Sequence, residues 1–112
     1  MLTLVMADGA YGASLCETRY SSRADLERTL RSENGRFFAG QGVRVALVSS
    51  PTRLTLWWLT TDRSRAYPAI ACVEKVQSPA GGLAQQEAEV NCHGALETAC
   101  KGLRRDIAKA KF

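Results

Sequence analysis

The sequence of 112 residues has no apolar run long enough to cross a membrane. A spanning helix needs about 18 to 20 such residues, and the longest run, from Leu2 to Ala7, is interrupted at Thr3. Internal repeats, low-complexity segments and an obvious linker are also missing. The chain is 46% hydrophobic and 23% charged, a balance typical of folded rather than disordered proteins. We therefore expect residues 1–112 to form one domain with one core.

The sequence also lacks the short motifs that mark common enzyme sites. It has no G-x-S-x-G, no P-loop and no Rossmann glycine pattern, and Gly81-Gly82 is typical of a turn. The closely spaced acids Glu87 and Glu89 fall on the outward face of a predicted strand, where acids are usually solubilising. We therefore expect a protein that is not an enzyme and has no cofactor.

Positive charge is present, but it forms no dense block. The net charge is +4, and the excess of basic residues is spread over the segments 19–36, 44–65 and 97–111. A single block would be the stronger indication of nucleic-acid binding. A cytosolic, basic nucleic-acid-binding module therefore stays an alternative and not the first hypothesis.

Residues 1–15 allow two interpretations. The apolar start is followed by small residues, with Ala10-Tyr11-Gly12 as a small-x-small site, and this resembles the end of an export signal. A basic segment before the apolar run is missing, however. The alternative is a short N-terminal strand that ends at Asp8-Gly9.

The four cysteines, Cys16, Cys72, Cys92 and Cys100, are an even count that permits two disulfides. Disulfides are typical of exported proteins, so we expect a periplasmic or secreted protein, with a cytoplasmic one as the alternative. We favour a bridge between Cys92 and Cys100, which leaves Cys16 to pair with Cys72. In the rival pairing, Cys72 and Cys92 are cross-strand neighbours and Cys16 joins Cys100. The strand register decides between the two.

The only histidine, His93, follows Cys92 directly. A catalytic pair needs both side chains within hydrogen-bond reach, whereas adjacent residues on a strand point to opposite faces. A zinc site could use His93 with Cys72, Cys92 and Cys100, but no C-x-x-C spacing supports it. We expect no metal, and a Cys- or zinc-dependent enzyme is the least favoured hypothesis.

Residue patterns predict a helix, four strands and a second helix. Ser22 is a good N-cap for a helix that stops at Asn34-Gly35, and an apolar stripe predicts the last helix from Ala95 to Lys109. Alternating apolar residues predict strands at 43–48, 54–59, 67–76 and 86–92. Phe37 and Phe38 are expected to insert into the core.

Short connections between these strands favour an antiparallel meander. We therefore expect an α+β fold, a two-layer sandwich in which a four-stranded antiparallel meander carries the N-terminal and the C-terminal helix on one face. The other face would be more exposed, and the two open edges of the meander suggest a homodimer.

The candidate binding residues are placed on the exposed face and on the last helix. Trp57 and Trp58 must point to opposite faces, so one of them faces the open side, where Arg44 or Arg53 would lie on neighbouring strands. Aromatic and cationic side chains suit a peptide, a glycan or single-stranded nucleic acid. The alternative is that the N-terminal segment or a partner subunit covers this tryptophan.

The last helix adds basic candidates, chiefly Arg104 and Arg105, which could contact phosphate or simply be solvated. Taken together, the patterns predict a small, disulfide-stabilised binding domain. A protein is the favoured partner, nucleic acid is the alternative, and no membrane insertion is expected.

Overall fold

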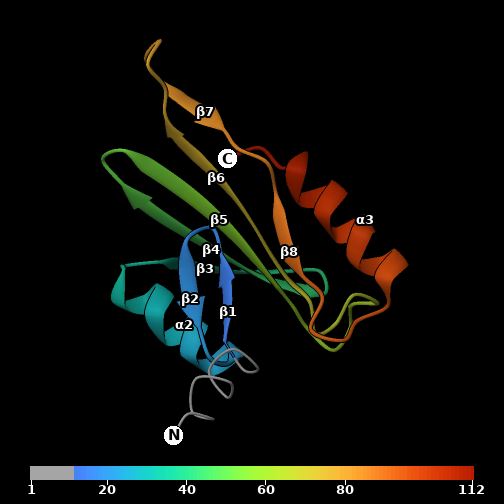
Figure 1. The fold of residues 1–112 in the computed structure, drawn as a ribbon. Helices are drawn as coiled ribbons and strands as arrows, with labels where there is room; N and C mark the ends of the chain where they lie inside the picture. Colours follow the sequence, from blue (N-terminus) through green and yellow to red (C-terminus); the bar gives the residue numbers. More distant parts are fainter. Residues whose placement is uncertain (1–11) are drawn as a thin grey trace, which may run out of the picture.

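The computed structural model describes residues 12–112, and its centre is an antiparallel sheet (Figure 1). Four strands pair in chain order: β3 (Arg36–Gly40), β4 (Val43–Ser50), β5 (Arg53–Thr60) and β6 (Ile70–Gln77). β7 (Leu83–Gln85) and β8 (Glu89–Asn91) both pair with β6, as two parts of one interrupted strand. Residues 12–112 thus form an α+β domain with two helices and an antiparallel meander.

The predicted meander differs from the structure in three details. β3 is an additional strand, because Phe37 and Phe38 pair with β4 rather than insert together into the core. The predicted strand at 86–92 is interrupted, and the amide of Gln86 donates to the carbonyl of Glu74 where β7 ends. The third strand begins at Ile70, because residues 61–69 form a turn-rich loop.

Helix α2 (Arg23–Ser32) follows a two-stranded hairpin of β1 (Ala13–Leu15) and β2 (Thr18–Tyr20), which was not predicted. Ser22 caps α2 as expected, since its side chain accepts a hydrogen bond from the amide of Asp25. The chain leaves the helix at Asn34, in the left-handed region, and at Gly35, where a Cβ would lie 2.7 Å from the carbonyl oxygen of Leu30.

Helix α3 (Glu97–Ala108) lies within two residues of its predicted bounds. No helix among residues 12–112 is long and apolar enough to span a membrane. The predicted end of an export signal and the alternative strand ending at Asp8-Gly9 fall almost wholly on residues 1–11, outside the described part. Of the candidate segment 1–15, residues 13–15 form β1.

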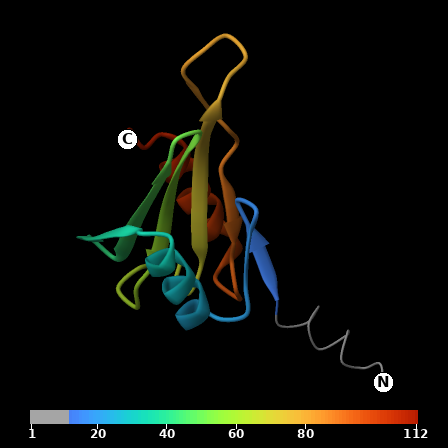
Figure 2. The ribbon, with the colours of Figure 1, turned by 90° about the vertical axis from the view of Figure 1, so that its left-hand side faces the viewer.

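The two helices lie on opposite faces of the sheet (Figures 1 and 2). On one face, Leu26 and Leu30 of α2 belong to a buried cluster with Trp57. On the other face, Leu103 and Ile107 of α3 belong to a second cluster. The expected packing of both helices on one face is therefore wrong. The physical reason is that β5 and β6 are apolar on both faces, so each face needs its own cover.

Disulfides hold each cover in place. Cys16, in the turn between β1 and β2, bonds to Cys72 of β6, and Cys92, just after β8, bonds to Cys100 of α3. The favoured pairing is thereby confirmed. Two disulfides in a domain of this size are more typical of an oxidising, extracytoplasmic compartment than of the cytosol.

Candidate functional site

The predicted binding residues Arg44 and Arg53 lie on the face that α2 covers, and both make ion pairs within the chain. An Arg44 Nη is 2.7 Å from a carboxylate oxygen of Glu27 in α2, and its guanidinium lies over the Phe37 ring. Arg53 pairs with Glu17 at 3.2 Å and with Glu74 at 3.3 Å. Arg44 thus links the sheet to α2, and Arg53 links it to the hairpin turn, so both charges are paired within the chain.

The two tryptophans point to opposite faces, as predicted. Trp57 is only 1% exposed, because α2 and the β1–β2 hairpin cover its face. The prediction of a surface position is therefore wrong for Trp57, which is a core residue. This is the outcome foreseen in the alternative, in which the N-terminal segment covers one tryptophan. Trp58 lies on the other face and stays half-buried.

The two arginines of α3 belong to the helix that packs on the Trp58 face, so they lie on the other side of the sheet from Arg44 and Arg53. Both α3 arginines are exposed, and Arg104 lines a shallow groove with Leu15, Glu87 and Glu89 at the β8 flank of the domain. The structure therefore does not gather the predicted cationic residues into one surface.

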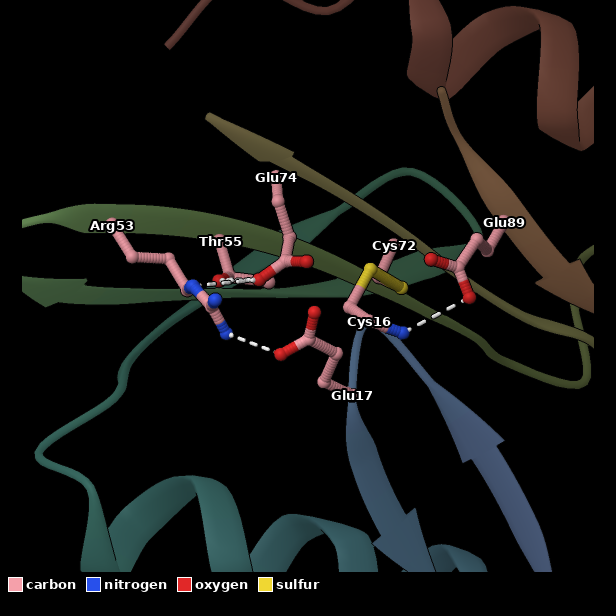
Figure 3. Close-up of a disulfide and its surroundings, with 7 residues drawn as sticks. All are labelled: Cys16, Glu17, Arg53, Thr55, Cys72, Glu74 and Glu89. Atoms are coloured by element: carbon pink, nitrogen blue, oxygen red, sulfur yellow. Dashed lines mark hydrogen bonds and ion pairs between the residues drawn. A yellow bond between two sulfur atoms is a disulfide. The ribbon is translucent and has the colours of Figure 1, made fainter. Parts of the chain in front are cut away.

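A charged pocket of about 320 Å³ lies beside the Cys16–Cys72 disulfide (Figure 3). Its charged lining consists of Glu17, Glu33, Glu74 and Arg53, and Trp57 and Thr55 line it as well. Arg53 bridges Glu17 and Glu74, and the Thr55 hydroxyl donates to Glu74. The cluster ties the hairpin turn to β5 and β6, next to the disulfide that bonds the same turn to β6.

Glu74 is the buried acid of this pocket, with 6% of its surface exposed. Burial raises its pKa above the ordinary value of 4.5, because water no longer solvates the charged form, and the carboxylates of Glu17 and Glu89 act in the same direction. Arg53 and the Thr55 hydroxyl oppose the shift. Burial therefore favours the neutral form of the Glu74 carboxyl.

Replacement of Glu74 by glutamine should therefore change how stability depends on pH. A raised folded-state pKa gives a contribution that is fully present below pH 4.5 and is lost as the pH rises through the raised value. We expect the free energy of unfolding of the wild type, measured by urea unfolding, to fall relative to that of Glu74→Gln as the pH rises above 4.5. A stability difference that stays constant with pH would contradict this, and Glu87→Gln serves as an exposed control.

His93 and the four cysteines all make contacts within the chain. The His93 Nε2 atom lies 2.8 Å from the Tyr20 hydroxyl, and burial, together with the charge of Arg23, lowers the pKa of His93. Cys92 is bonded to Cys100, so the Cys–His pair and the four-ligand zinc site both lack free thiols. Residues 12–112 contain no group of three or more His, Cys, Asp or Glu side chains that could hold a metal ion.

The face opposite α2 carries an apolar surface that α3 covers only in part. α3 packs on β6 and β8, whereas the strands β3 to β5 continue beyond it (Figures 1 and 2). We call this surface the open half-sheet and define it by Phe38, Val45, Leu47 and Trp58. Val45, Leu47 and Trp58 are half-buried, and Phe38 is 52% exposed.

The strand register joins these side chains into one surface. Phe38 lies opposite Val45, and Val45 lies opposite Trp58, so the three form a row across the sheet. Leu47 lies on the same face, two residues further along β4, opposite Leu56. The inference from sequence included Trp58 but missed its neighbours. The available signal was that the apolar residues of β4 occur on both of its faces.

A pocket of about 470 Å³ lies between α3 and the loop before β6, and it is lined by Leu96, Ala99, Leu103 and Ala66 among others. Ala66 and Leu103 belong to the same buried cluster on which Trp58 packs. Leu96, at its rim, is 67% exposed. On this face of the sheet, apolar side chains are thus accessible both at the open half-sheet, through Phe38, and at the α3 pocket, through Leu96.

No protein-family model, no curated protein and no solved structure matches this chain.

Proposed function

We propose that this chain is an exported, non-enzymatic domain that binds a different protein on the open half-sheet. The observation that carries the proposal is the row of Phe38, Val45 and Trp58, which is apolar and only partly covered by α3. Contiguous apolar surface of this kind is typical of interaction sites in folded proteins.

The distribution of apolar residues along β4 supports burial of its open face by a binding partner. Strands with water on one face usually alternate apolar with polar residues, whereas strands buried on both faces are apolar throughout. β4 has Val45 and Leu47 on one face and Ala46 and Val48 on the other. The second pair is covered within the chain, and a partner protein would cover the first.

A protein fits this surface better than a nucleic acid. The open half-sheet has aromatic and aliphatic side chains, which are characteristic of the centre of protein interfaces. Arg36, on the same face of β3, is the basic residue nearest to it in the strand register, opposite Leu47. Single-stranded nucleic acid would instead need a basic groove along its backbone, and Arg44 and Arg53 are already paired with acids.

The two disulfides support export to the periplasm or secretion as the setting for this binding. They keep the hairpin and α3 in place without a large core, which suits a small domain in an oxidising compartment.

Photo-crosslinking in the native host tests the proposal. We would place a photoreactive phenylalanine analogue at Leu47, in the open half-sheet, and at Leu83, an exposed leucine on β7. We expect light-dependent adducts with a different protein from position 47 and not from position 83, identified by mass spectrometry. Equal adducts at both positions, no adduct at 47, or adducts containing only this chain would contradict the proposal.

A further inference from the structure

We infer that a second copy of this chain pairs with β3 and extends the sheet through a two-fold axis at Phe38. The inference goes beyond the proposed function, since the second copy binds at the edge of the sheet and leaves its face free. It rests on two observations. The β3 edge of the sheet is exposed and continuous whereas the opposite edge is interrupted, and the sequence of β3 is self-complementary.

β3 is the continuous exposed edge of the sheet. Within residues 12–112 it pairs only with β4, and four of its five residues are exposed (Figure 2). Such an edge offers unpaired backbone groups to another strand, and proteins that avoid this pairing use proline, charged side chains or a bulge. The segment Arg36–Gly40 has no proline, its one charged residue is Arg36 at its end, and its pairing with β4 runs through all five positions without a bulge.

The opposite edge has the features that discourage pairing. It consists of β7 and β8, of three residues each, with an interruption between them. The β1–β2 hairpin also approaches β8, where the Cys16 amide donates to the Glu89 side chain at 3.1 Å. A second strand would therefore find a short and interrupted ladder there, in contrast to β3.

The sequence of β3 is complementary to itself in one antiparallel register. When Phe38 lies opposite Phe38 of the second copy, all five residues pair, with Phe37 opposite Ala39 and Arg36 opposite Gly40. Each pair joins residues of the same face, as antiparallel pairing requires. No arginine lies directly opposite another arginine, and the central pair is aromatic, which favours cross-strand packing. Any shifted register leaves residues of β3 unpaired.

This register also continues the open half-sheet across the axis. The row of Trp58, Val45 and Phe38 would meet the same row of the second copy, which doubles the apolar surface on one face. On the other face, Phe37 is held beneath the guanidinium groups of Arg31 and Arg44, at 4.5 and 5.1 Å. β3 is thus already ordered for pairing, which lowers the entropic cost of association.

Sedimentation of the purified, oxidised protein tests the inference. We expect a concentration-dependent shift from 12.2 kDa to twice that mass at micromolar concentrations for the wild type. Phe38→Lys should stay monomeric, and Leu83→Lys, the matched change at the other edge, should dimerise as the wild type does. Both residues are about half exposed, so both variants should keep the wild-type circular dichroism. A monomeric wild type, or a dimer that survives Phe38→Lys, would overturn the inference.

Cysteine cross-linking tests the register independently. Residues directly opposite each other in an antiparallel pair have Cα atoms about 4.5 to 5.5 Å apart, within the range of a disulfide. Phe38→Cys should therefore give a disulfide-linked dimer on mild oxidation, and Ala39→Cys should give little. Equal yields would contradict the two-fold axis at Phe38. Neither result affects the adduct expected at Leu47 with a different protein, so the two proposals fail separately.

Discussion

Replacement of Cys16 and Cys72 by alanine is expected to lower the free energy of unfolding by about 4 kcal/mol. The bridge closes a long loop, with a sequence separation of 56, and therefore removes many conformations from the unfolded chain. Both residues are also buried in the cluster around Trp57 and are the covalent link between the hairpin and β6. Urea unfolding under oxidising conditions measures the loss.

The second disulfide is the matched control for this prediction. Cys92 and Cys100 are separated by only 8 positions, and the same relation between loop length and entropy gives a loss of about 2.5 kcal/mol for their replacement by alanine. We therefore expect removal of the Cys16–Cys72 bridge to lower the free energy of unfolding more than removal of the Cys92–Cys100 bridge. Equal losses, or a larger loss for the short loop, would show that packing of α3 and not loop entropy dominates.

Truncation of Trp57 to alanine should cost about 3 to 5 kcal/mol, as is typical for a buried aromatic residue that leaves a cavity. Its side chain is 1% exposed and packs on the covered face with Leu26 and Leu30 of α2. α2 is tied to the sheet mainly through this cluster and through the pair of Arg44 with Glu27. The loss should therefore appear in the stability of the whole domain.

The adjacent residue provides a control of the same chemistry. Trp58→Ala removes a half-buried side chain, so its effect on the free energy of unfolding should be smaller than that of Trp57→Ala. Trp58→Ala should also weaken the cross-linking at position 47, because it removes part of the open half-sheet. If Trp58→Ala is the more destabilising of the two and leaves cross-linking unchanged, the assignment of the two faces is wrong.

Local patterns in the sequence predicted much of the secondary structure, because their physical causes are local. Ser22 caps α2 through its own neighbour Asp25, and the period-two alternation of β4 and β5 reflects the backbone geometry of a strand. The same alternation required Trp57 and Trp58 to face opposite sides. β3 was missed because its five residues, Arg-Phe-Phe-Ala-Gly, do not alternate, and only pairing with β4 makes them a strand.

The candidate site was less predictable, because exposure is a property of the assembled layers. Arg44 and Arg53 were expected on an open surface, and the structure instead places them in ion pairs with Glu27, Glu17 and Glu74. Nothing in the local sequence marks Glu74 as buried, since its burial results from the hairpin that Cys16 brings over β6.

What the sequence alone determined was the α+β class, the antiparallel meander, both helices and the even set of cysteines whose favoured pairing the structure has. Only the tertiary structure decided which face each helix covers, which tryptophan is buried and where an apolar surface and a free edge remain. The physical reason is that propensity, capping and alternation act over a few residues. The choice of face depends instead on register and on contacts such as that of Cys16 with Cys72, 56 positions apart.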